Sequence, residues 1–276
     1  MNKPKSRLIF EDLDVPMGII RLSILIGILL LIAFSVSAKL PEGDLLAGVN
    51  PDENGRIDIL LVFAHQDDES IYSGGAVLKA MKHPRVRLYI LCMTFDQTSE
   101  AKDVLGITPD HIGNIRIKEL ETAATVYQAE AVIHFKYASH TLGEQDPEKV
   151  IEEIKEVIDK TGAEIVLTHD PAGITAHPDH IACNKFATEA FKRSDAQVLY
   201  YPVFPSWFYP VFLRFFPNRE PGEPAKPDFK VNIREQKKLK RMACYAHASQ
   251  MKFTSVGGVS ELMLLKNYEY FSRVIR

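Results

Sequence analysis

The chain has 276 residues, of which 46% are hydrophobic and 25% are charged, the balance of an ordinary globular protein with one sizeable core. Its net charge of -3 and pI near 6.3 exclude the clustered positive charge on which nucleic-acid binding depends, so no nucleic-acid partner is expected. Three scattered cysteines exclude a disulfide framework, and we expect them to be small buried residues.

The N-terminal region, residues 1–38, contains an uncharged apolar segment that predicts targeting to a membrane. Residues 22–38 read LSILIGILLLIAFSVSA. As a helix with ~1.5 Å rise per residue this segment measures about 25 Å, and residues 17–20 bring it near the ~30 Å hydrocarbon thickness of a bilayer. It is therefore a signal anchor or, because small residues end it at Ala38, a cleaved signal peptide. The alternative is a buried core helix.

Positive charge lies mainly before this segment and predicts its orientation. Lys3, Lys5, Arg7 and Arg21 precede the apolar run, whereas only Lys39 follows it closely. Lys and Arg stay on the cytoplasmic side of a membrane. We therefore expect the region that follows to lie outside the cytoplasm, either membrane-anchored or secreted.

Residues 39–55 are rich in Pro, Gly, Asp and Asn, which predicts a linker, and residues 56–276 form the predicted catalytic domain. Within that domain, short apolar runs alternate with amphipathic stretches. The predicted strands cover residues 57–63, 86–94, 131–135, 164–168 and 197–201. The predicted helices cover residues 70–82, 113–128, 147–160 and 179–192.

This repeated β-α order predicts an α/β fold, a Rossmann-like three-layer sandwich with a mostly parallel sheet. The expected strand order is 3-2-1-4-5, with the N-terminal hydrophobic helix preceding the fold. Ligands of such sheets bind beyond the carboxyl ends of the strands, at the point where the strand order reverses. The site should therefore lie on the loops after Phe63 and Thr168.

Both loops carry unusual residues. After the first strand, residues 64–69 read A-H-Q-D-D-E, an imidazole followed by three carboxylates. Like charges so close together raise one another's pKa and are tolerated mainly in open solvent or around a metal. After the fourth strand, residues 177–180 read H-P-D-H, which alone indicates a surface loop or a metal site. Because both motifs are expected at the same end of the sheet, together they favour a metal site.

These motifs resemble those of the LmbE-like and PIG-L-like metal-dependent de-N-acetylases, whose marks are A-H-P-D-D-E and H-P-D-H. Two more motifs fit: R-x-x-E-L with A-A at residues 116–124, and A-H-x-S-Q at residues 246–250. The resemblance covers roughly residues 57–257. The sequence departs from the family at Gln66, where proline is usual, and at Thr94-Phe95-Asp96, where a glycine is common on the substrate side.

The resemblance implies that His65, Asp68 and His180 bind a zinc ion. Two imidazoles and one carboxylate leave positions open for water and substrate. Iron(II) suits the same donor set. His247, from the last motif, is expected to support the pocket wall rather than bind the metal.

The resemblance also assigns the catalytic residues. Asp67 is the general base, and His177 stabilises the oxyanion and protonates the leaving amine. Asp179 is expected to hold the imidazole of His177 in the donor tautomer. Arg116 is expected to contact a sugar or phosphate, or else to pair with a carboxylate on its own helix.

The implied activity is that of a zinc-dependent hydrolase removing the acetyl group from an N-acetylglucosamine-type sugar, with a lipid-linked glycoconjugate as one candidate carrier of that sugar. The alternatives are a zinc amidase acting on a thiol conjugate or an acylated antibiotic, and a non-catalytic sugar-binding domain. The last would predict loss of Asp67 or of a ligand, and all are present.

An aromatic run at residues 204–216, FPSWFYPVFLRFF, raises a further expectation. It predicts an apolar lip beside the site that touches a membrane or a lipid substrate. The alternative is that these side chains complete the core behind the fifth strand.

Overall fold

The computed structural model describes residues 40–205, 208–209 and 222–275. Residues 40–276 form one compact unit. The predicted signal or anchor segment at residues 1–38 lies outside the described residues. Within the described part of the chain, no helix is both long and apolar enough to cross a membrane.

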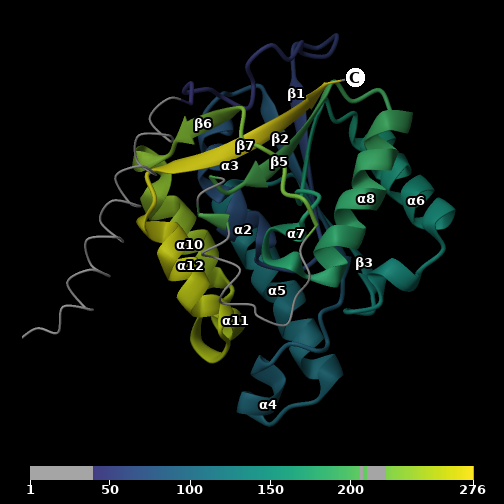
Figure 1. The fold of residues 1–276 in the computed structure, drawn as a ribbon, viewed down its shortest axis with the longest axis vertical. Coiled ribbons are helices and arrows are strands. Elements are labelled where there is room, and N and C mark those ends of the chain that lie inside the picture. Colours follow the sequence, from purple (N-terminus) through teal and green to yellow (C-terminus); the bar gives the residue numbers. More distant parts are fainter. Residues whose placement is uncertain (1–39, 206–207, 210–221, 276) are drawn as a thin grey trace, which may run out of the picture. The chain divides into compact units, whose positions relative to one another are not determined.

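A seven-stranded sheet in the order β3-β2-β1-β4-β5-β7-β6 organises the domain (Figure 1). Its first five strands are parallel. They are β1 (Ile57–Phe63), β2 (Val86–Thr94), β3 (Ala131–Tyr137), β4 (Ile165–Thr168) and β5 (Val198–Val203). The predicted strands and the predicted order 3-2-1-4-5 are confirmed, because buried apolar runs joined by helices admit few other arrangements.

Two antiparallel strands extend this sheet and were not predicted. They are β6 (Phe229–Asn232) and β7 (Tyr268–Ile275), with β7 lying between β5 and β6. β7 reads YEYFSRVI and alternates in burial over its first four residues, as a strand with one covered face does. The sheet is therefore mostly parallel with an antiparallel edge.

Helices cover both faces of the sheet. Side chains of β1 alternate, with Ile59 and Leu61 in one core and Leu60 and Val62 in the other. α6 and α8 pack on the second face (Figure 1). The helices are α2 (Asp68–Tyr72), α3 (Gly74–Ala80), α4 (Ala101–Leu105), α5 (Pro109–Tyr127), α6 (Pro147–Thr161), α7 (Gly173–Ala176), α8 (Pro178–Arg193), α10 (Lys237–Ala246), α11 (Ala248–Phe253) and α12 (Val256–Leu265), with 3-10 turns at Leu142–Glu144 and Arg234–Gln236.

The helix predicted at residues 70–82 is split into α2 and α3. The carboxylate of Glu269, on β7, accepts hydrogen bonds from the amides of Gly75 (3.0 Å) and Ala76 (2.7 Å) at the start of α3. Lys240, buried on α10, donates to Glu269 (2.6 Å) and to the carbonyl of Ile71 on α2 (2.8 Å). These contacts satisfy backbone groups at the break, so two short helices replace the continuous one.

The segment at residues 40–55, predicted to be a linker, packs against the domain instead. Leu45 and Val49 are buried in the core that contains Ile59. Its backbone also bonds with Lys230 of β6, through the carbonyl of Pro41 and the amide of Gly43. Pro and Gly content indicated a loop correctly, but two spaced apolar side chains are enough to anchor such a loop.

The aromatic run predicted as a lip is only partly described, since Trp207 and residues 210–216 lie outside the described residues. Phe204 and Phe208 pack against a small core that includes Ile71 and Met263. Lys266 Nζ lies over both rings, 4.3 Å and 4.6 Å from their centroids. For these two phenylalanines the packing alternative holds.

Candidate metal centre and active site

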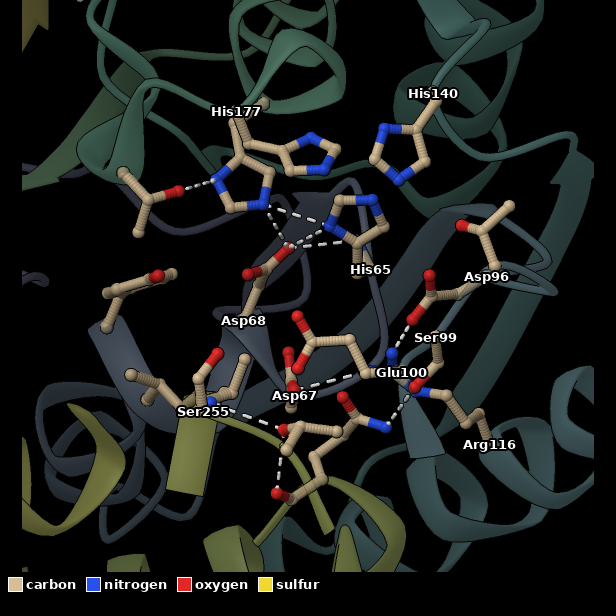
Figure 2. Close-up of a pocket in the computed structure, with 18 residues that line it drawn as sticks. His65, Asp67, Asp68, Asp96, Ser99, Glu100, Arg116, His140, His177 and Ser255 are labelled. Atoms are coloured by element: carbon tan, nitrogen blue, oxygen red, sulfur yellow. Dashed lines mark hydrogen bonds and ion pairs between the residues drawn. The ribbon is translucent and has the colours of Figure 1, made fainter. Parts of the chain in front are cut away.

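The candidate site lies at the carboxyl ends of β1 and β4, where the strand order reverses. Residues 64–69 follow β1 and residues 169–177 follow β4, and the two strands pair in parallel up to Val62 and Thr168. A cavity of about 190 Å³ opens beside these loops (Figure 2). The predicted position of the site at the switch point is confirmed.

Three donor atoms converge in this cavity. His65 Nδ1 lies 2.9 Å from His180 Nε2 and 3.7 Å from Asp68 Oδ2, and the last two atoms are 3.5 Å apart. Ligands of a tetrahedral zinc ion lie about 2.0–2.2 Å from the metal, which sets them roughly 3.3 Å from one another. The structure thus brings the three predicted ligands to a metal-binding spacing.

The other nitrogen of each imidazole is engaged by an acceptor. His180 Nδ1 lies 2.9 Å from the carbonyl oxygen of Gly173, and His65 Nε2 lies 3.1 Å from Asp179 Oδ2. Because these oxygens only accept hydrogen bonds, both of those nitrogens carry the hydrogen. The nitrogens that face each other across 2.9 Å therefore both present lone pairs.

Two facing lone pairs repel each other unless a cation lies between them. Burial, followed by the neighbouring His180, lowers the pKa of His65 well below its usual range, so its imidazole stays neutral. Burial raises the pKa of Asp68, against the attraction of His180. A divalent metal would remove both the repulsion between the two nitrogen lone pairs and the cost of burying the Asp68 carboxylate. The donor atoms present fit such a metal.

Two further histidines lie within reach of the same ligands. His177 groups with His65 and His180, and His169 groups with Asp68 and His180. His169 is fully buried, stacks on the ring of His180 at 3.9 Å and has its Nε2 3.2 Å from Asp68 Oδ2. Burial lowers the pKa of His169 to about 3. Because His169 contacts both Asp68 and His180, it supports these two predicted ligands.

Asp67, the predicted general base, lies next to the ligands in an unusual backbone conformation. Its φ of 117° is in a region that side chains rarely adopt, at a cost of about 1–3 kcal/mol. Its amide donates to Glu69 Oε2 (3.0 Å), and its Oδ2 lies 3.1 Å from Arg116 Nη2. Burial raises the pKa of Asp67 to about 7, in spite of the opposing charge of Arg116. A carboxyl with that pKa suits proton transfer near neutral pH.

Arg116 lines the cavity, as a substrate-contacting residue would, but its ion-pair partners are not on its own helix. Its guanidinium pairs with Asp67 and with Asp96, and it donates to the carbonyl of Gln66. Its partners come from the loops after β1 and β2 and not from its own helix, and the side chain is only 2% exposed. The guanidinium of Arg116, which was expected to contact a sugar or phosphate, is therefore already paired with two carboxylates and a carbonyl.

The pairing predicted between Asp179 and His177 is also different. Asp179 Oδ2 accepts from His65 Nε2 and from the amide of His140 (2.7 Å), whereas it lies 3.9 Å from His177 Nδ1. The amide of Asp179 donates to His177 Nδ1 instead (3.1 Å), because His177 caps the start of α8. His177 still has its proton on Nε2, but a backbone amide fixes the tautomer.

The loop after β4 is held in a strained conformation. Gly173, Ile174 and Ala176 have φ values of 69°, 56° and 54°. The buried Asp170 accepts from the amide of Ile174 (2.7 Å), and burial raises its pKa to about 6. The strain orients the carbonyl of Gly173 toward His180, so the loop fixes a predicted metal ligand.

The histidine of the last motif, His247, supports the loop after β1. His247 is fully buried, and its Nε2 lies 2.9 Å from Glu69 Oε1. Burial opposes the charge of both groups, but their mutual attraction outweighs it, raising the pKa of His247 and lowering that of Glu69. Because Glu69 also accepts from the amide of Asp67, this ion pair positions Asp67, the predicted general base.

The third and fourth motifs meet in space. Both carboxylate oxygens of Glu119 accept from Ser249, one from its amide and one from its hydroxyl, each at 2.7 Å. Gln250 donates to Ser99 Oγ at 2.8 Å. The spacing within each motif therefore serves to join α5, α11 and the loop before α4 around the pocket.

Several pocket residues were not predicted. His140 lines the cavity, with its ring 4.8 Å from that of His177. No carboxylate stands near it in the sequence, so no local signal identified it. The wall also includes two distant segments, Thr98–Glu100 and Gln250 with Thr254–Val256. Only the tertiary fold brings these segments together.

Fold and donor set together define a class: α/β domains with a divalent-metal site at the switch point of a mostly parallel sheet. Residues 60–191 match the family described as PIG-L: GlcNAc-PI de-N-acetylase. This stretch of the chain is a PIG-L family domain, so the predicted resemblance is confirmed. Deacetylases of this family are metal-dependent.

Relatives of known description are de-N-acetylases. The chain is 30% identical over 141 residues to a probable N-acetylglucosaminyl-phosphatidylinositol de-N-acetylase of Schizosaccharomyces pombe, a match covering 49% of this chain and 52% of that protein. It is 28% identical over 198 residues to a probable N-acetyl-alpha-D-glucosaminyl L-malate deacetylase 2 of Bacillus anthracis, covering 70% of this chain and 80% of that protein.

Solved structures share the fold. The N,N'-diacetylchitobiose deacetylase from Pyrococcus horikoshii superposes with a TM-score of 0.57 at 19% identity, covering 84% of this chain and 88% of that one. The 4-carboxy-2-hydroxymuconate hydratase GalB of Pseudomonas putida superposes equally well, with a TM-score of 0.57 at 15% identity and coverage of 80% and 97%. The fold is thus used for more than one reaction, and the reaction must be argued from the site.

Proposed function

We propose that this domain is a metal-dependent hydrolase that removes the acetyl group from an N-acetylglucosamine-type sugar. The observation that carries the proposal is the convergence of His65, Asp68 and His180 beside Asp67 in an open pocket. A sugar-binding domain without catalysis would not need a buried carboxyl with a pKa near 7 next to a cation site.

The side chains have distinct tasks in such a hydrolysis. His65, Asp68 and His180 would hold a divalent cation, which would supply Lewis acidity to polarise the acetamide carbonyl and to lower the pKa of water. Asp67 takes the proton of the attacking water, and Arg116 holds Asp67 in place. His177, with its proton on Nε2, donates to the oxyanion and then to the leaving amine.

Zinc is the proposed metal, because two neutral imidazoles and one carboxylate form a common zinc donor set, and iron(II) would fit the same atoms. The relatives support an N-acetylated sugar as substrate, since those named above act on glucosaminyl compounds attached to phosphatidylinositol or malate. A lipid-linked substrate remains part of this proposal through the apolar N-terminal segment.

The proposal includes location. Residues 1–38 deliver the domain across a membrane, as an anchor or as a cleaved signal, because their positive charges precede the apolar run. A reporter enzyme fused after Arg276 should be active outside the cytoplasm. Activity confined to the cytoplasm would overturn this part of the proposal.

The function is tested by acetate release from the purified full chain, loaded separately with Zn²⁺ and Fe²⁺. Mass spectrometry should detect the free amine when the substrate is an N-acetylated sugar or sugar lipid. N-acetylated thiol conjugates and acylated glycopeptides serve as comparison substrates. Faster cleavage of these would assign the chain to another amide, and no cleavage of any would overturn the enzymatic function.

A further inference from the structure

We infer that the outer face of α10 and α12 is a membrane-binding surface, and that it fits a bilayer containing anionic phospholipids. This basic-apolar face is defined by the exposed side chains of Lys238, Arg241, Met242, Tyr245, Leu262 and Leu265. The inference goes beyond the proposed hydrolysis, because binding to a bilayer is measured without a substrate.

The charge of this region differs in sign from that of the whole chain. Residues 237–266 contain six Lys or Arg residues against one acidic residue, Glu261, which is a net charge of +5, whereas the whole chain has a net charge of -3. Lys240, one of the six, is buried and pairs with Glu269. Lys238, Arg241 and Lys252 are exposed to solvent. Positive charge gathered in this way is attracted to anionic lipid headgroups.

The same helices expose large hydrophobic side chains. Ten such side chains are exposed in the part of the chain that the structure describes, and six of them lie on α10, α11 and α12. Leu265 is 68% exposed, Met242 50% and Leu262 44%. Single exposed apolar side chains are common on soluble proteins, but a group of them on neighbouring helices indicates an interaction surface.

Contacts between α10 and α12 join the charged and apolar side chains into one face. Lys237 Nζ, at the start of α10, donates to the carbonyl oxygen of Leu265 at the end of α12 (3.2 Å). Tyr245 Oη, near the end of α10, donates to Glu261 Oε1. The two helices therefore lie side by side and run antiparallel, with α11 next to both (Figure 1).

A bilayer fits this face better than other partners do. Helices that bind at a membrane interface place apolar side chains at the acyl boundary and keep Lys and Arg at the headgroups. Nucleic acid would use the positive charge but would leave Leu262 and Leu265 in contact with water. A second copy of this chain would bring like charges together, which disfavours that interface.

The basic-apolar face lies beside the pocket. Thr254–Val256 line the cavity and form the turn between α11 and α12. Lys252 and Phe253 are exposed directly before this turn. A membrane bound to the face would therefore lie close to one wall of the pocket, where a sugar carried by a lipid could reach it.

Cosedimentation with vesicles tests the inference. Residues 40–276 form a compact unit that contains all three hydrophobic cores, so they are used without the apolar N-terminal segment, which would itself enter a bilayer. The vesicles are phosphatidylcholine alone, or phosphatidylcholine and phosphatidylglycerol at about 2:1. We expect partitioning to be at least about tenfold stronger with the anionic vesicles. Equal partitioning into both, or none into either, would overturn the inference.

Removing charge tests the basic half of the face. Lys238→Gln with Arg241→Gln should weaken partitioning into the anionic vesicles roughly 10–30-fold, because each Lys or Arg near such a surface contributes about a factor of five. Lys149→Gln with Lys185→Gln removes the same charge from exposed positions on α6 and α8, which cover the other face of the sheet. This control should partition almost as the wild type does. Equal losses in the two double variants would mean that only net charge matters, which contradicts the inference.

Removing apolar surface tests the other half. Leu262→Ser with Leu265→Ser should weaken partitioning about tenfold or more, and Ile275→Ser, a change at an equally exposed position on β7, should not. Circular dichroism and metal content verify that each variant is folded. If ultracentrifugation without vesicles shows a dimer that Leu262→Ser with Leu265→Ser dissociates, the face binds a second copy and the inference is wrong.

Discussion

The two sides of the pocket differ in how firmly they are held. On the metal side, His65, Asp68 and His180 are buried, and each bonds to a backbone group or a second side chain. On the opposite wall, Thr98, Glu100 and Ser255 line the cavity from short segments, and their side chains are exposed. The difference indicates that the chemistry is fixed by a rigid support, whereas recognition depends on side chains that can change without disturbing it.

Metal binding and turnover should both be lost when one predicted ligand on the rigid side is removed. Asp68→Ala deletes one of three donors, so we expect loss of the bound metal and a fall in turnover of more than about 10⁴-fold. Metal content by mass spectrometry and acetate release check this. Asp103→Ala, an exposed change on α4, is the control. A metal content unchanged in Asp68→Ala would remove Asp68 from the ligand set.

Asp67→Asn should separate catalysis from metal binding. The amide cannot accept the proton of water, but no ligand is lost, so we expect kcat to fall about 10²–10⁴-fold with the metal retained. The pH profile adds a check, since the pKa of about 7 places loss of activity on the acid side, where Asp67 is protonated. Near wild-type kcat in this variant would contradict its role as the base.

Asp179→Asn should weaken metal binding without abolishing it. The carboxylate holds the Nε2 hydrogen of His65 and two backbone amides, of His140 and Leu142. Loss of such a support typically weakens metal affinity about 10–100-fold. Competition with a chelator measures the affinity, and circular dichroism verifies folding. If the variant bound metal normally but lost its acid catalysis, Asp179 would serve His177 after all.

His247→Gln should have the smallest effect on turnover and act mainly on stability. Breaking a buried ion pair costs about 3–5 kcal/mol of unfolding free energy. The contribution of Glu69, whose pKa is lowered, is lost as pH falls below its ordinary 4.5, and that of His247, whose pKa is raised, is lost as pH rises through a value above 6.5.

The difference in unfolding free energy between wild type and His247→Gln should therefore be greatest between pH 4.5 and 6.5. Denaturant titrations at several pH values measure it. A difference that does not vary with pH would mean that the pair is not ionised.

The sequence was sufficient to predict the parallel half of the fold and the position of the metal site. Apolar runs of five to nine residues and capped amphipathic helices are local signals, and the switch-point rule converts their order into a location. The partners of Arg116 and Asp179 could not be predicted, because they depend on which loops meet at one edge of the sheet. β7 was missed because the buried Glu269 interrupts the face that carries Phe271, and Ser272 interrupts the other face between Tyr270 and Val274, so neither face reads as an apolar strand.

The ion pair of Lys240 with Glu269 has a consequence for how the chain folds. Residues near the C-terminal end hold α2 and α3, which follow the first strand, so a contact spanning about 190 residues completes the support of the metal loop. Contacts so distant in sequence form late. A chain still emerging from the ribosome or a translocation channel would have its metal-binding residues in place without their anchor. We therefore expect a stable metal site to appear only after β7 has been added, so that activity is absent until that strand has been synthesised.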